Sequence, residues 1–114
     1  MFRHEDEAPW QQPPGHFDAY SRYLVGPDHD SRQFDFRTSR YPTGGYVEEH
    51  SHDVEEQVYY ILSGTGIMRC GDETREVGPG SVIFVPARVV HGIRNEGAED
   101  LTFVVVTSPP GIPR

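Results

Sequence analysis

The fold of this chain is decided by the stretch GGYVEEHSHDVEEQVYYILSG, residues 44–64. Its two histidines, His50 and His52, end a predicted strand over Tyr46–His52. Successive side chains of a strand point to opposite faces, so residues two apart share a face, with Cβ atoms roughly 6–7 Å apart. Two imidazoles at that spacing can hold one metal ion. Alone, the pattern is a weak signal, because two histidines at a surface are more often simply solvated.

A third histidine strengthens the metal interpretation. His91 belongs to the predicted strand Val89–Arg94 and is the remaining histidine of the strand-rich part of the chain. We therefore take it as a partner of His50 and His52. The other histidines fall in predicted loops or in the N-terminal tail, and we treat them as bystanders. They are His4, His16 and His29.

Short strands separated by turn residues fill the chain from residue 20 onward. Gly 12 and Pro 10 mark many turns among 114 residues, and no window of ten or more residues has a helical period. The sequence thus predicts an all-β body of eight or nine strands, closed into a barrel or sandwich. The predicted strands are Tyr20–Val25, Gln33–Arg40, Tyr46–His52, Gln57–Leu62, Thr65–Cys70, Glu73–Val77, Ser81–Val85, Val89–Arg94 and Leu101–Thr107.

Two of these strands and the N-terminal arm carry more apolar surface than a single small domain covers. The runs Val82–Val85 and Phe103–Val106 are apolar on both faces, which predicts burial on both sides, in a sandwich or at an oligomer interface. Trp10 and Phe17 lie in the irregular segment 1–19, which is either a disordered tail or an arm packed on the body or on a partner subunit. We expect a homodimer.

Composition excludes several classes of function. With 10 basic and 18 acidic residues the formal net charge is −8, which argues against nucleic-acid phosphates and anionic membrane surfaces as partners. The chain has no lysine, so Schiff-base chemistry and a P-loop are excluded. No apolar run approaches the roughly 18 residues of a membrane span, and the N-terminus lacks a signal-peptide core. Cys70 is the single cysteine, so we expect a cytoplasmic protein without intrachain disulfides.

The spacing of residues 44–64 resembles the first motif of the cupin superfamily. That motif is a glycine, five residues, His-x-His, three or four residues, a glutamate, six residues and a second glycine. Here Gly44 is followed after five residues by His50 and His52, then after four by Gln57 and after six more by Gly64. The match departs from the family at one ligand position, where Gln stands in place of Glu.

A second cupin motif follows fifteen residues later, a spacer typical of single-domain members. The family pattern is a glycine, five residues, Pro-x-Gly, two residues, a histidine, three residues and an asparagine. In this chain Gly80, Pro86, His91 and Asn95 occupy the matching positions. Arg88 stands where the family has glycine, so either this turn needs no positive φ or the loop differs.

The resemblance covers about residues 34–107 and implies a double-stranded β-helix, the jelly-roll barrel of a small monocupin. The expected organisation is an N-terminal arm and first strand over 1–33, the barrel over 34–108 and a C-terminal tail over 109–114. It also implies one divalent transition metal per chain, Fe, Mn, Ni, Co, Cu or Zn, held by His50, His52, His91 and a fourth ligand.

Two residues compete for that fourth position. The six-residue spacing back from Gly64 selects Gln57, whereas the spacing from His52 permits Glu56 as well. We favour Gln57, because the hairpin spacing is rigid and the preceding loop is elastic. With Gln57 all ligands are neutral and a divalent ion keeps its full charge, which attracts an anionic ligand. With Glu56 the reduced charge favours higher oxidation states and oxygen chemistry.

The alternation of side chains between the two faces of a strand indicates which further groups would lie near the ion. If Gln57 faces inward, so does Tyr59, which becomes the candidate hydrogen-bond donor or acid; the alternative is a core aromatic with its hydroxyl satisfied locally. Arg37 and Arg69 would clamp a substrate carboxylate if they faced inward. We favour ion pairing with the acidic surface for both arginines.

Three functions follow in order of preference. The first is a metal-dependent enzyme that chelates a small anionic, oxygen-rich substrate, with isomerase, lyase or dioxygenase chemistry as found among cupins. The second is a non-catalytic small-ligand-binding or sensor cupin. The third is a structural domain with relic histidines, which leaves three histidines at ligand spacing unexplained.

Overall fold

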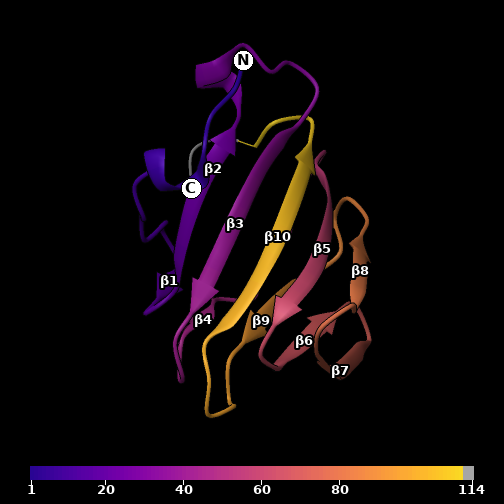
Figure 1. The fold of residues 1–114 in the computed structure, drawn as a ribbon. Coiled ribbons are helices and arrows are strands. Elements are labelled where there is room, and N and C mark those ends of the chain that lie inside the picture. Colours follow the sequence, from indigo (N-terminus) through magenta and orange to yellow (C-terminus); the bar gives the residue numbers. More distant parts are fainter. Residues whose placement is uncertain (112–114) are drawn as a thin grey trace.

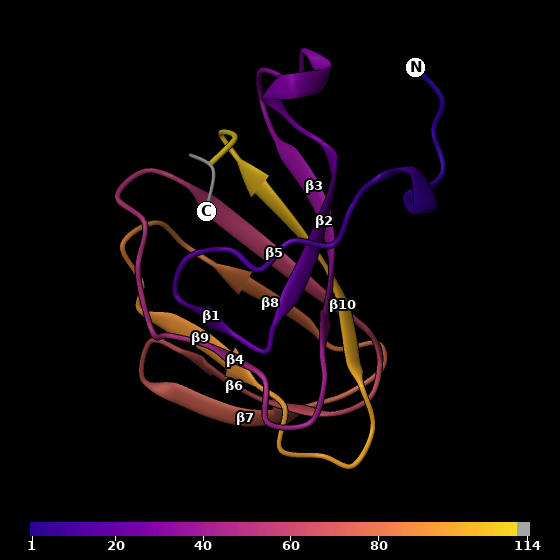
Figure 2. The same ribbon diagram turned by 90° about the vertical axis from the view of Figure 1, so that its left-hand side faces the viewer.

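Two five-stranded antiparallel sheets pack face to face in the computed structural model, which describes residues 1–111 (Figure 1, Figure 2). One sheet has the order β2-β3-β10-β5-β8 and the other β1-β4-β9-β6-β7. Residues 112–114 of the expected C-terminal tail lie outside the described part. The strands are β1 His16–Phe17, β2 Tyr20–Val25, β3 Asp35–Tyr41, β4 Tyr46–Val47, β5 Glu56–Ser63, β6 Gly66–Cys70, β7 Glu73–Val77, β8 Val82–Val85, β9 His91–Arg94 and β10 Leu101–Ser108.

The jelly-roll prediction is confirmed, and strand β10 shows how the sequence pattern produces it. β10 lies in the middle of its sheet, between β3 and β5. Every second side chain points into the barrel, as the two-residue period of a strand requires. Burying these side chains and their neighbours provides the main stabilisation of the barrel. The largest apolar members of this core are Tyr41, Tyr59, Ile61, Met68, Ile93, Leu101 and Phe103.

The predicted strand Tyr46–His52 is wrong over most of its length. Only β4, Tyr46–Val47, is regular, and the chain then leaves the ladder. It returns for a single antiparallel bridge, in which His50 N donates to His91 O at 3.0 Å and His91 N donates to His50 O at 2.9 Å. The segment between β4 and β5 is therefore a loop fixed to β9 at the two histidines.

Of the two ways in which the sequence predicts burial of Val82–Val85 on both faces, burial within the sandwich of one chain is wrong, and burial at an oligomer interface stays a prediction. β8 is an edge strand that pairs, among residues 1–111, with β5 alone. Val85 is 1% exposed on the inner face, whereas Val82 and Phe84 are 64% and 56% exposed on the outer face. The outer face of this edge is thus apolar and uncovered by the chain itself.

The N-terminal arm lies along β2 on the outside of the barrel (Figure 2). Gln11 and Ser21 exchange two backbone hydrogen bonds, of 2.9 and 2.8 Å. The Trp10 ring contacts two guanidinium groups, those of Arg22 at 4.1 Å and Arg40 at 5.1 Å from its centroid. In the described part of the chain the helical segments are two single 3-10 turns, Glu5–Glu7 and Pro27–His29. Within residues 1–111, no helix has the length and apolar character needed to cross a membrane.

Two turns fix the strands that carry the histidines. Gly64 links β5 to β6 with φ +78°, and a Cβ there would lie 2.3 Å from the Asp100 carbonyl oxygen, so only glycine fits. Arg88 also has a positive φ, 70°, and its N–H donates to His52 O at 2.6 Å. The turn before His91 therefore keeps the backbone conformation that the family glycine suits, although an arginine occupies it.

We predict that Arg88→Gly stabilises the protein. A non-glycine residue in the left-handed region costs about 1–2 kcal/mol, which glycine does not incur. Glycine also makes the unfolded chain more flexible, which destabilises the folded protein by about 0.5–1 kcal/mol, so the gain exceeds the loss. The melting temperature, followed by circular dichroism, is expected to rise by a few degrees. The control is Arg75→Gly on the exposed strand β7. This variant is expected to lower the melting temperature, because glycine within a strand is destabilising. A decrease for both variants contradicts the prediction.

Candidate metal centre

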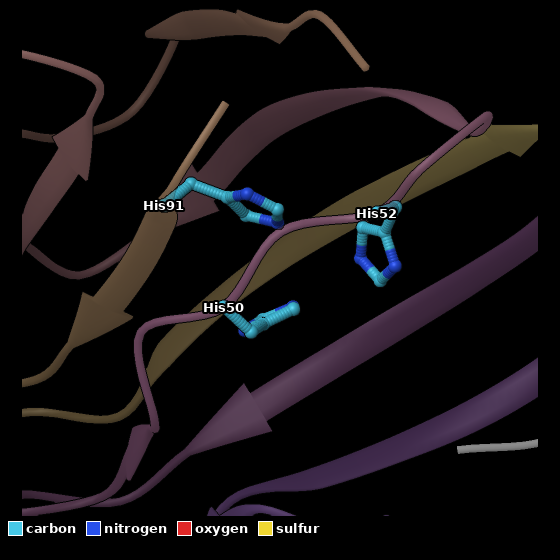
Figure 3. Close-up of side chains that lie close together, drawn as sticks. All are labelled: His50, His52 and His91. Carbon is cyan, nitrogen blue, oxygen red and sulfur yellow. The ribbon is translucent and has the colours of Figure 1, made fainter. Parts of the chain in front are cut away.

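Three imidazole rings meet at one end of the barrel (Figure 3). His50 and His52 come from the loop between β4 and β5, and His91 begins β9. One ring nitrogen from each lies within 4.8 Å of the others. The ring centroids are 4.4 Å apart for His50 and His91, and 4.9 and 5.3 Å apart for the pairs that include His52. This spacing suits a common metal ion.

An oxygen atom faces Nδ1 of each ring, by a hydrogen bond for His50 and His91 and by an ion-pair contact for His52, so that Nε2 can act as the ligand atom. His50 Nδ1 lies 2.6 Å from Glu48 O and His91 Nδ1 lies 2.9 Å from Val89 O. A carbonyl only accepts, so Nδ1 carries the proton in both rings and Nε2 carries the lone pair. His52 Nδ1 faces the carboxylate of Glu55 at 3.6 Å. Such oxygen acceptors behind histidines are the usual support of a metal site.

His91 is the most deeply placed of the three. Its side chain is 0% exposed, and burial lowers the pKa of His91 to about 4. The imidazole is therefore neutral near pH 7, the form that binds metals. Its Nε2 is buried and has no hydrogen-bond partner among residues 1–111. An orphaned buried nitrogen is costly in a closed core and fits a ligand of a metal ion.

Gln57 and Glu56 lie on opposite faces of β5. Gln57 is 2% exposed, and its Nε2 donates to Thr107 Oγ1 at 3.1 Å. Its Oε1 is buried and unpartnered among the described residues. Glu56 is exposed on the outer face. The amide oxygen, and not the carboxylate, thus faces the barrel interior.

Tyr59 follows Gln57 on the inner face of β5. Its side chain is 2% exposed. The ring stacks on Phe103 with centroids 5.6 Å apart and meets the His91 ring edge-on at 6.3 Å. Tyr59 thus packs as a core aromatic residue, and its ring also lies beside the histidine cluster.

The two candidate arginines have different surroundings. Arg69 donates from Nη1 to Glu49 Oε1 at 3.0 Å on the surface, as we expected. For Arg37 that expectation is wrong, because the side chain is 4% exposed and lies inside the barrel. Residues 35–41 alternate between buried and half-buried, and Arg37 falls on the buried face of β3.

Sequence reasoning missed several parts of the site. Glu55 behind His52 gave no signal, because it lies in a loop of acidic residues. The inward direction of Thr107 could have been predicted from the two-residue period of β10. Its contact with Gln57 also needs the pairing of β10 with β5. A pocket of about 220 Å³ adjoins His50 and His52, and residues 14–16 of the arm form one of its walls. Nothing in the sequence of the arm indicates this.

Asn95, the last residue of the second motif, is a structural residue. It is 0% exposed. Its Nδ2 donates to Tyr41 O at 2.8 Å and to Glu99 O at 2.7 Å, and its Oδ1 accepts from Gly97 N at 2.8 Å. The side chain therefore holds the loop between β9 and β10 in place and has no direct role at the histidines.

Comparison with known proteins agrees with this architecture. An oxalate-binding protein of Thermotoga maritima is 34% identical over 71 residues, 62% of this chain and 59% of the relative. Quercetin 2,3-dioxygenase of Bacillus subtilis is 27% identical over 77 residues, 68% of this chain and 23% of the enzyme. The chain matches only about three fifths of the length of its first curated relatives.

A solved structure shares the whole fold. The crystal structure of a predicted oxalate decarboxylase from Thermotoga maritima superimposes with a TM-score of 0.85 and 24% identity, covering 96% of this chain and 99% of that one. A sequence profile described as the Cupin domain matches residues 37–107, more than half of the chain. Together with the double-stranded β-helix and the three-histidine cluster, this match shows that the chain belongs to the cupin family.

Proposed function

We propose that this protein is a metal-dependent enzyme that acts on a small, anionic, oxygen-rich molecule. The observation that carries the proposal is the convergence of three histidines whose Nδ1 atoms are held by oxygen acceptors, which leaves Nε2 of each ring for a common ion. The small pocket beside His50 and His52 agrees with a small-molecule substrate. As compartment we propose the cytoplasm, which suits a single free cysteine.

The proposed ligands are His50, His52, His91 and Gln57. Gln57 is preferred over Glu56 because its amide oxygen is buried and unpartnered among residues 1–111, whereas Glu56 is exposed. All four donors are then neutral. A divalent Fe, Mn, Ni, Co, Cu or Zn ion held by them, one per chain, would supply a Lewis acid with its full charge, suited to binding substrate oxygens and stabilising negative charge.

We assign Tyr59 as the candidate acid or hydrogen-bond donor. Its ring lies edge-on to His91 and is shielded from solvent. A phenol in this position would orient a bound substrate or move a proton to it, while the apolar wall formed with Phe103 excludes water. The neutral ligand set favours proton transfer of the isomerase or lyase type over dioxygenase chemistry.

A non-catalytic ligand-binding role is the second candidate. It is favoured by the relative named an oxalate-binding protein, with which the chain shares 34% identity. The two functions differ in one measurable way. A binder saturates with its ligand without forming product, and an enzyme turns the ligand over.

We predict that removing one histidine abolishes metal binding. Asn in His91→Asn keeps an amide N–H near the position of Nδ1, which donates to Val89 O, but has no atom equivalent to Nε2. Metal per chain, measured by inductively coupled plasma mass spectrometry on untagged protein, is expected to fall from near one to near zero for His91→Asn and His50→Ala. His4→Ala, at the exposed start of the arm, is the control. Full metal content in the two site variants refutes the ligand assignment.

We predict that Gln57→Glu changes the metal preference. A carboxylate at this position lowers the charge of the filled site and favours harder or more oxidised ions. Competition among Mn²⁺, Fe²⁺, Co²⁺ and Zn²⁺ during reconstitution is expected to give a different metal ratio from that of the wild type. The matched control is Glu56→Gln on the outer face, which should leave the ratio unchanged. The reverse result makes Glu56 the ligand.

We further propose a homodimer through the outer face of β8, β5 and β10. Two rows of apolar residues cross these strands in register, and Val82 and Phe84 are more than half exposed. Such a face suits a second copy of the same chain, because both copies would cover apolar surface. The rows are Val82, Tyr60 and Val104, and Phe84, Val58 and Val106.

We predict that Phe84→Asp weakens the dimer about ten-fold or more, because it buries a charge in the apolar interface. Sedimentation equilibrium at micromolar protein measures the effect. Thr74→Asp adds the same charge on the exposed strand β7 and serves as control. A monomeric wild type contradicts the proposal.

A further inference from the structure

Arg37 is a buried cation in the sheet that faces the histidines. It lies in the middle of β3, and 4% of the residue is exposed. Its register partner on β10 is Val105, which in turn pairs with Tyr59 on β5. Arg37 and Tyr59 therefore lie in the same row of the inner face. The Tyr59 ring meets His91, so this row runs beside the histidine cluster.

The ion pairs of the described residues include none with the Arg37 guanidinium. Among residues 1–111 no carboxylate lies within 4.0 Å of it, and its Nε and Nη1 have no hydrogen-bond partner. Asp35, on the same face of β3, accepts a hydrogen bond from Gly111 N at 2.9 Å. The Tyr23 ring lies over one face of the guanidinium, with 5.8 Å between the ring centroid and Cζ.

A buried, unpaired guanidinium carries a desolvation cost of several kcal/mol. A purely structural arginine offsets that cost with carbonyl or carboxylate acceptors, and those are missing at Nε and Nη1. The unpartnered Nε–H and Nη1–H lie on different edges of the guanidinium, and each is a charged donor that can bind a carboxylate oxygen.

Arg37 thus brings a buried positive charge to the inner face of β3, on which Asp35 is also buried, in a chain of net charge −8. Three neutral imidazoles and a neutral amide leave the charge of a bound divalent ion uncompensated, and Arg37 adds another positive charge. We propose that Arg37 binds a carboxylate of the substrate, which is therefore a small carboxylic acid with further oxygen donors for the metal. This inference rests on the proposed function, because it assumes that the histidines hold a metal ion.

The test compares Arg37→Met with wild type in protein loaded with Co²⁺. Isothermal titration calorimetry measures binding of oxalate, a carboxylate probe, and of 4-nitrocatechol, a chelator without a carboxylate. Arg37→Met is expected to take up Co²⁺ as wild type does, to bind 4-nitrocatechol unchanged and to bind oxalate about ten-fold more weakly or worse. The matched control is Arg40→Met, on the same strand with its guanidinium over Trp10 outside the barrel, which should bind both probes like wild type.

Each other outcome is decisive. Equal oxalate affinity in Arg37→Met and wild type overturns the inference and leaves the metal centre intact. Loss of Co²⁺ in Arg37→Met alone also overturns it, because Arg37 would then support the metal site and not the substrate. A wild type that takes up no Co²⁺ overturns the proposed function, and this inference with it. Arg37→Gln provides the same comparison should Arg37→Met not fold.

Discussion

The pair of backbone hydrogen bonds between His50 and His91 holds the candidate site together. The chain between β4 and β5 has left the sheet, and these two bonds are its antiparallel connection to β9. Because partners in such a bridge project their side chains to the same side, the bridge also brings the two imidazoles together, with centroids 4.4 Å apart and planes tilted by 54°. A third bond, from Arg88 N to His52 O, positions the remaining histidine. The geometry of the cluster is thus a property of the backbone, and each side chain needs only one acceptor behind it.

The charged residues of the loop between β4 and β5 and those inside the barrel have different surroundings. The acidic residues of the loop between β4 and β5 lie at the surface, where Glu49 pairs with Arg69 and Glu55 supports His52. Inside, Arg37 and Asp35 are both buried on the inner face of β3, and Gln57 and Thr107 are buried neutral polar groups. A low-dielectric wall strengthens the field of the buried Arg37 charge. The anion that we propose as substrate would meet this charge inside the barrel, although the molecule as a whole is acidic.

The sequence contained most of the fold and part of the site. The bounds of β2 and β7 follow from the turn residues that flank them, and the shared inward direction of Gln57, Tyr59 and Ile61 follows from the two-residue period of β5. The prediction failed where tertiary contacts outweigh local pattern. The pattern of residues 48–52 predicts a strand, but the segment pairs with β9 at a single bridge. The sequence predicts Arg37 at the surface. Its burial depends on the strands packed around β3, which the local sequence does not reveal. The contacts of Glu55 and of the arm near the pocket depend on loop geometry, which periodicity does not encode.

The packing of the arm has a spectroscopic consequence. Trp10 is the only tryptophan of the chain, and it lies between Arg22 and Arg40 on the outside of β2, whereas the aromatic ring in contact with the cluster is a tyrosine. Emission excited at the red edge of indole absorption therefore reports whether the arm is seated on the barrel. Occupancy of the centre has to be followed through tyrosine absorption or through the d–d bands of a bound ion. The same protein thus offers two separate optical signals, one for each side of the sheet.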